Sequence, residues 1–137
     1  MSYGAAAALQ KAVYETLLAD AGLADLVAGR IYDALPSGAV PETYVALGPE
    51  DVRDRSDKTG RGAEHRFTVS VVSEASGFSA VKTVAARIGD VLLSANPTLD
   101  RGLLVGIWFE RATAKRSGPG GRLRRIDMRF RARVDNT

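Results

Sequence analysis

Few side chains in this sequence are of a type and in a setting that would support chemistry. His65 is the only histidine, and a catalytic base of this kind needs an orienting acid and a nucleophile beside it. Neither Ser70 nor Asp51 lies in a recognisable hydrolase motif. We therefore predict no catalytic residue and no enzyme. We interpret His65 as a solvated or hydrogen-bonded histidine where the central strand begins.

Two further patterns resemble ligand sites only in outline. Asp51, Asp54 and Asp57 recur every three residues but lack the pattern of a calcium loop, and the chain has no cysteine to bind a metal. The run Gly118-Pro119-Gly120-Gly121 lacks the Lys-Ser/Thr pair that follows a phosphate-binding loop, so we interpret it as a hairpin turn. We expect no metal and no cofactor.

Basic side chains near the C-terminal end form the clearest charge pattern. Residues 1–100 carry 9 basic and 13 acidic residues, whereas residues 101–137 carry 10 and 3. A basic stripe binds phosphate, pairs with carboxylates of a neighbouring subunit, or is solvated. We favour the subunit interface because no aromatic residue alternates with the stripe to stack on bases. The stripe consists of Arg125, Arg129, Arg131 and Arg133.

Hydrophobic periodicity predicts the elements that position these residues. Apolar residues at helical spacing predict helices over residues 5–21 and 78–95, with a short helical turn over 24–27. Alternating residues predict strands over 43–47, 67–72, 103–116 and 122–134, and an extended Ile31-Tyr32. We expect an α+β fold: a mostly antiparallel sheet with two helices packed on one face and a long C-terminal β-hairpin, in a single domain spanning 1–137.

Four local expectations follow from the same patterns. Residues 50–64 are charged and glycine-containing, with Val52 as their one sizeable apolar residue, which predicts a long mobile loop that orders on contact with a neighbour. The basic tip of the hairpin should project beyond the sheet as an arm. Trp108 is either an interface anchor or packed under a second layer. The core-facing residues of the strand that carries it are predicted to be Leu103, Val105, Ile107 and Phe109.

Length and composition agree with an ordinary globular chain. The 137 residues have a net charge of +3, and no apolar stretch approaches the ~20 residues of a membrane-spanning helix. The first residues lack the basic start and apolar core of a secretory signal. We expect no membrane association and synthesis in the cytoplasm.

Four short motifs resemble a known family in their order and spacing. They are Ala5-Ala6-Ala7-Ala8-Leu9 with Val13-Tyr14, Arg30-Ile31-Tyr32-Asp33 with Leu35-Pro36, Gly77-Phe78 at the second helix, and the closing strand Leu123 to Val134. Together they cover nearly the whole chain and resemble the tail terminator, or tail-completion, proteins of tailed phages and gene transfer agents. The chain departs from many relatives after the central strand, where it has Val72-Ser73-Glu74 in place of a tryptophan.

The resemblance implies a structural role at the head–tail junction of a phage-like particle assembled in the bacterial cytoplasm. A terminator of this family forms a homohexameric ring on the tail tube, stops tube polymerisation and joins the tail to the head-side connector, or stopper. Its partners are thus itself, the tube protein and the connector, while DNA passes through the lumen without specific binding. The alternative is a nucleic-acid-binding accessory protein that uses the basic C-terminal strand.

The basic residues and the single tryptophan are our candidates for the subunit or tail/connector interface. They are Arg53, Arg55, Lys58, Arg61, Trp108, Arg116, Arg122, Arg124, Arg125, Arg129, Arg131 and Arg133.

Overall fold

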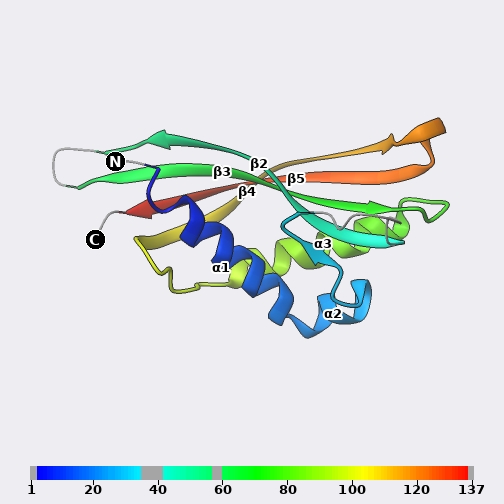
Figure 1. The fold of residues 1–137 in the computed structure, drawn as a ribbon, viewed down its shortest axis with the longest axis horizontal. Coiled ribbons are helices and arrows are strands. Elements are labelled where there is room, and N and C mark those ends of the chain that lie inside the picture. Colours follow the sequence, from blue (N-terminus) through cyan, green and yellow to red (C-terminus); the bar gives the residue numbers. More distant parts are fainter. Residues whose placement is uncertain (1–2, 35–41, 57–59, 136–137) are drawn as a thin grey trace.

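The computed structural model describes residues 3–34, 42–56 and 60–135 and has an α+β fold, as predicted (Figure 1). The helices lie together on one side of a long twisted sheet, and the other side is bare in the described part of the chain. In chain order the elements are α1 (Ala6–Ala19), α2 (Ala21–Val27), β1 (Ile31–Tyr32), β2 (Thr43–Asp54), β3 (Gly62–Ser73), α3 (Ser79–Ser94), β4 (Leu103–Ser117), a 3-10 turn (Pro119–Gly121) and β5 (Leu123–Asp135).

The sheet has the strand order β1-β2-β3-β5-β4. Only the two-residue pairing of β1 with β2 is parallel, and the other neighbours are antiparallel. The last two strands form the predicted C-terminal hairpin. Within it β5 is inserted between β3 and β4, which leaves β4 at an edge of the sheet.

The core lies between the helices and the facing side of β3 and β5. Alternate residues of β5, from Ile126 to Val134, are buried against the helices, as the sequence pattern predicts. Phe130 is completely buried at the centre, with its ring stacked on Phe67 at 5.6 Å and touched edge-on by Phe109 at 5.9 Å. The helices contribute apolar residues at helical spacing: Leu9, Val13, Leu17, Val81, Val84, Ile88 and Leu92.

The connection between helices is fixed by one carboxylate. Asp20 caps the start of α2 by accepting the N–H of Leu23 at 2.9 Å, and it also accepts two bonds from the Arg87 guanidinium of α3 at 2.8 and 2.7 Å. Arg87 is the largest influence that lowers the pKa of Asp20. At its other end α2 stops at Ala28, a non-glycine residue in the left-handed region with φ of 52°.

The predicted mobile loop over residues 50–64 is wrong for most of its length. β2 continues to Asp54 and β3 begins at Gly62, and the two pair from Glu50 opposite Phe67 to Asp54 opposite Ala63. The charged side chains fit a strand here because, in the described part of the chain, no second layer covers one side of the sheet. Asp57 and Lys58 lie outside the described residues.

Two bulges change half of the predicted inward set on β4: Ile107 and Phe109 lie on the helix side as predicted, opposite Ala132 and Phe130, but Leu103 and Val105 do not. Register shifts between Leu104 and Gly106, and again between Phe109 and Arg111, each add one residue to β4 relative to β5. Leu104 is therefore the buried residue that faces Val134, while Val105 is exposed in the bulge. Leu103 pairs with Asp135 and is exposed on the bare face, so it does not join the core either.

The expected arm is wrong as well, because the hairpin is part of the sheet along its whole length. β5 pairs with β3 from Asp135 opposite Gly62 to Arg124 opposite Ser73. Arg124 further donates to the carbonyl of Ser76 at 3.0 Å and lies over the Phe78 ring. β3 extends further than predicted and supplies a partner for every residue of β5 except the first, so only the turn extends past the ladder.

His65 is not the solvated or hydrogen-bonded histidine that the sequence suggested. Its side chain is 0% exposed in the middle of the sheet, opposite Val52 on one side and Ala132 on the other. Neither ring nitrogen has a hydrogen-bond partner among the described residues. Burial lowers the pKa of His65, so the ring is neutral at physiological pH.

Candidate interaction surface

The bare face of the sheet gathers most of the predicted basic residues. Because strand residues alternate between faces, the β5 residues that lie between the buried ones point away from the helices. The cross-strand register places Arg53, Glu64 and Arg133 in one row, and Asp51, Arg66, Arg131 and Trp108 in the next. We call this helix-free side of β2, β3, β5 and β4 the open face.

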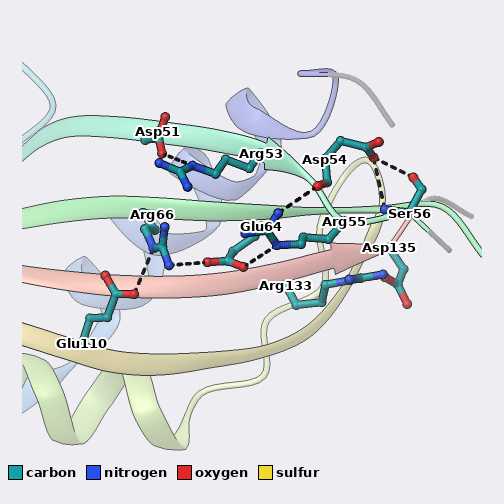
Figure 2. A network of polar contacts seen from close by, with 10 residues as sticks. All are labelled: Asp51, Arg53, Asp54, Arg55, Ser56, Glu64, Arg66, Glu110, Arg133 and Asp135. Atoms are coloured by element: carbon teal, nitrogen blue, oxygen red, sulfur yellow. Dashed lines mark hydrogen bonds and ion pairs between the residues drawn. The ribbon is translucent and has the colours of Figure 1, made fainter.

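Ion pairs link the basic residues of the open face across its strands (Figure 2). The nearly buried Glu64 binds Arg55 at 3.1 Å and Arg66 at 3.0 Å. Arg66 also donates to Glu110 at 2.9 Å, and Glu110 lies 3.4 Å from Arg129. The bond to Glu110 raises the pKa of Arg66, so its charge is fixed at any physiological pH.

Shorter pairs within single strands complete this network. Arg53 contacts Asp51 at 3.0 Å in β2, and Arg133 contacts Asp135 at 2.7 Å in β5. Such partly exposed pairs contribute little to stability individually, but they satisfy the charges locally. These arginines of the open face are therefore engaged with acidic partners within the chain.

A second polar cluster lies closer to the hairpin turn. Asp127 accepts a hydrogen bond from Ser70 at 2.6 Å and one from Arg125 at 2.8 Å, with Lys115 at 3.6 Å. Partial burial opposes ionisation of Asp127, yet the bonds from Ser70 and Arg125 prevail and lower its pKa. This cluster ties β3, β5 and β4 together.

Trp108 lies on the open face, where the residue is 43% exposed. The Arg131 guanidinium lies 4.9 Å from the ring centroid, which is a cation–π contact. No second layer covers this ring in the described part of the chain, so packing under another layer is not its role here. Its role as an interface anchor stays a prediction.

The predicted interface residues do not form one site. Arg53, Arg55, Trp108, Arg129, Arg131 and Arg133 come together on one end of the open face, and Arg125 belongs to the Asp127 cluster. Arg116 and Arg122 are exposed beside the turn, Arg61 is exposed before β3, and Arg124 points to the helix side. Lys58 lies outside the described residues.

Sequence reasoning missed the acidic partners of the open face. On β3, every second residue from Glu64 through Arg66 to Thr68 points to the open face. This alternation indicates a strand, but it was missed because residues 50–64 were predicted to form a loop. Glu110 occupies the second bulge of β4, and nothing in a strictly alternating pattern points to it. These acids explain why so many arginines gather on one face without mutual repulsion.

The described residues contain no group of three or more acidic, histidine or cysteine side chains placed to hold a metal ion. Among the helices of the same residues, none is long and apolar enough to cross a membrane. What the structure does offer is a bare sheet face with its charges paired and a long exposed edge. An exposed strand edge offers unpaired backbone groups with which another chain can pair.

Comparison with known proteins identifies the class more closely. A family model described as Tail completion protein gp17 matches residues 11–135, and the chain belongs to this family. Its role is accordingly structural, in the tail of a phage-like particle, where it contacts other tail proteins.

A solved structure supports this assignment. The chain is similar to one from the structure titled "Virion of native gene transfer agent (GTA) particle", with 54% identity and a TM-score of 0.92. The similarity covers 98% of this chain and 100% of that one. A comparison with curated proteins gives no match.

Proposed function

We propose that the protein is a tail terminator: it forms a homohexameric ring on the end of the tail tube, stops addition of tube protein and joins the tail to the head-side connector. The observation that carries the proposal is the near-complete similarity to a chain of a gene transfer agent virion, combined with membership of the tail-completion family. The chain acts as a single domain in this proposal, and DNA passes through the ring.

The paired charges of the open face support the proposal that DNA passes through the ring without being bound. Tight DNA binding needs several unpaired basic groups that each contact a phosphate, and its strength falls steeply with salt. Arg53, Arg129 and Arg133 instead contact Asp51, Glu110 and Asp135 of their own chain. We therefore expect weak binding to double-stranded DNA that vanishes at physiological salt. Retention of DNA at that salt would favour a nucleic-acid-binding accessory role.

Electron microscopy of particles made without this gene tests the terminator function directly. The expected result is overlong tubes, or tails separated from filled heads, with normal morphology restored by a plasmid-borne copy. Joined tails of normal length in the deletion strain would refute the proposal.

The interface role of the open face is tested by reversing two of its charges. Arg129→Glu with Arg131→Glu should reduce the yield of joined particles, because two positive charges that the open face presents to a neighbouring protein become negative. A folded monomer, checked by circular dichroism, must be retained. Lys82→Glu on the exposed side of α3 is the matched control and should leave the yield unchanged. Equal yields for both variants would remove Arg129 and Arg131 from the interface.

A further inference from the structure

A hollow of about 190 Å³ lies on the open face, over β4 and β5. Its lining includes Thr68, Arg111, Thr113, Lys115, Asp127 and Arg129. Arg111 and Arg129 occupy directly opposite positions of the two strands. Like charges that face each other across a sheet repel, so this arrangement destabilises the isolated subunit until an anion lies beside the two guanidinium groups.

Arg111 differs from the other arginines of the hollow because its charge is not paired. Its guanidinium forms no hydrogen bond or ion pair with any residue that the structure describes. Arg129 lies 3.4 Å from Glu110, but Glu110 also binds Arg66 at the shorter distance of 2.9 Å. The hollow therefore keeps positive charge that the acids of the same chain do not neutralise.

Lys115 adds a second cation that is only loosely held. Its ammonium lies 3.6 Å from Asp127, which accepts shorter bonds from Arg125 at 2.8 Å and Ser70 at 2.6 Å. Both Lys115 and Arg111 are exposed on β4. Together these two side chains can bind one further anionic group.

A single carboxylate suits the hollow better than a chain of phosphates. Arginine binds a carboxylate through two parallel N–H bonds. A DNA strand needs several unpaired cations in a row, and the Asp127 carboxylate in the lining repels a polyanion. The lining, as far as the structure describes it, holds no aromatic ring on which a base could stack. The chemistry of the hollow thus favours an Asp or Glu side chain of another protein.

α2 exposes a carboxylate of this kind. Residues 6–27 carry three acids and one base. Among those acids, Asp25 is exposed and forms no hydrogen bond or ion pair with the described residues. Leu26 beside it is 40% exposed, and Trp108, in the row next to Arg111, is 43% exposed. Each surface therefore combines an unpaired charge with an exposed apolar side chain, and the two charges are opposite.

The two surfaces lie on opposite sides of the subunit. α2 belongs to the helix layer, whereas the hollow lies on the open face (Figure 1). A contact between them is heterologous, because each copy uses one surface toward the copy before it and the other toward the copy after it. Repeated rotation closes such a contact into a ring. Two open faces repel each other through their surplus positive charge, which disfavours a two-fold symmetric dimer.

We propose that the hollow around Arg111 binds the Asp25 carboxylate of a second copy of this chain. The inference rests on the proposed ring and names one pair of surfaces that holds neighbouring copies together. The cations of the hollow contact the carboxylate, while Leu26 packs beside Trp108. The bound carboxylate also offsets the repulsion between Arg111 and Arg129.

Zero-length cross-linking tests the contact. Arg111→Lys keeps the positive charge and places an amine in the hollow, which a water-soluble carbodiimide joins to a touching carboxylate as an amide, the reagent taking up the water that is lost. The variant replaces the wild-type protein in particles, which are treated and run on a denaturing gel. We expect bands of linked copies, in which mass spectrometry locates a link between position 111 and Asp25 of another copy.

Two controls identify the amine and the carboxylate of this link. Arg122→Lys adds a lysine at an exposed position beside the turn, outside the hollow, and should give no link to Asp25. Asp25→Asn in the Arg111→Lys background removes the carboxylate and should abolish the link from position 111.

A charge exchange tests whether assembly depends on the contact. Arg111→Glu and Asp25→Arg should each lower the yield of joined particles by about tenfold, because like charges then face each other. The double variant should recover most of the yield. The isolated Arg111→Glu protein should be at least as stable in urea as the wild type, since the repulsion with Arg129 is gone. A purely structural role of Arg111 predicts a less stable protein instead.

The remaining outcomes separate this inference from the proposed function. Normal rings without a link to Asp25, or a double variant no better than the single ones, would overturn the contact and leave the terminator role intact. A link from position 111 to a different tail protein would overturn the second copy as the occupant. DNA retention at physiological salt that disappears in Arg111→Glu would assign the hollow to phosphate and overturn the inference as well. Wild-type tails without any ring would overturn the proposed function and the inference together.

Discussion

Replacing His65 with leucine should stabilise the isolated protein, because it removes a buried ring that has no hydrogen-bond partner among the residues the structure describes. The side chain is completely buried, and its cross-strand neighbours Val52 and Ala132 are apolar. An unpaired buried polar group costs about 1–3 kcal/mol, and a volume-conserving swap to an apolar residue costs less than about 1.5 kcal/mol. We expect a net gain of about 1 kcal/mol in the free energy of unfolding near neutral pH.

The gain in unfolding free energy from His65→Leu should be larger in mild acid. Burial lowers the pKa of His65 in the folded state, whereas an unfolded histidine titrates near ~6.5. As the pH falls through that value the unfolded state binds more protons than the folded state, so the stability of the wild-type protein decreases. The slope approaches about 1.4 kcal/mol per pH unit. His65→Leu lacks this component, and its advantage should grow by about 1 kcal/mol between roughly pH 7 and pH 5.5.

Urea denaturation followed by far-ultraviolet circular dichroism at the two pH values measures both effects. The matched control is Thr68→Val, a change of similar shape on the other face of the same strand, which alters no titrating group. Its pH dependence should equal that of the wild type. An advantage of His65→Leu that is the same at both pH values would refute the reasoning. A loss of more than about 1.5 kcal/mol would show that the ring makes favourable contacts.

Three further substitutions test the backbone and the helix connection. Ala28→Gly should stabilise by about 0.5–1 kcal/mol in urea denaturation, because the residue ends α2 with φ of 52°. Gly102→Ala should cost about 1–3 kcal/mol in the same assay, since φ is 86° and a Cβ would lie 2.7 Å from the Val134 side chain. Asp20→Ala should lower the thermal midpoint, because it removes the cap of α2 and the carboxylate that binds Arg87. Arg87 lowers the pKa of Asp20, so the wild-type carboxyl becomes protonated only below its usual pKa, and the difference in thermal midpoint between wild type and variant should disappear there.

The elements that the sequence predicts well are those with a fully covered face. β5 alternates buried and exposed residues from Ile126 to Val134 because the helices cover one side and solvent contacts the other. α3 is equally clear, since Val81, Ile88 and Leu92 share the side that packs on the sheet. In both cases the environment of each residue repeats regularly, so periodicity alone reveals it.

The paired segments Glu50 to Asp54 of β2 and Gly62 to Arg66 of β3 were missed because both of their faces are largely polar. Glu50 and His65 occupy the helix side, while Asp51 and Glu64 occupy the open face, so no apolar alternation marks a strand. This segment is ordered by hydrogen bonds to a neighbouring strand, and the pattern of its own residues does not reveal such pairing. Gly62, which suggested a loop, is instead a buried strand residue beside the Arg133 side chain.

The bulges and the ion pairs were hidden for a related reason. A bulge shifts the phase of alternation, so Leu104 and Ile107 face the core although they are three residues apart. The pair between Arg66 and Glu110 joins residues 44 positions apart and exists only in one cross-strand register. The predicted basic stripe was correct in composition, but its charge balance depended on these distant acids.

The place of β5 between β3 and β4 also sets an order of events when the chain is made. β4 leaves the ribosome before β5, yet its only strand neighbour in the described sheet is β5. Leu104 and Ile107 thus remain without their sheet partners until Val134 and Ala132 have been synthesised. Pairing over such sequence distances is slow compared with helix formation. A nascent chain therefore cannot present a finished β4 edge, and the timing of translation itself delays any association that uses this edge until the subunit has folded.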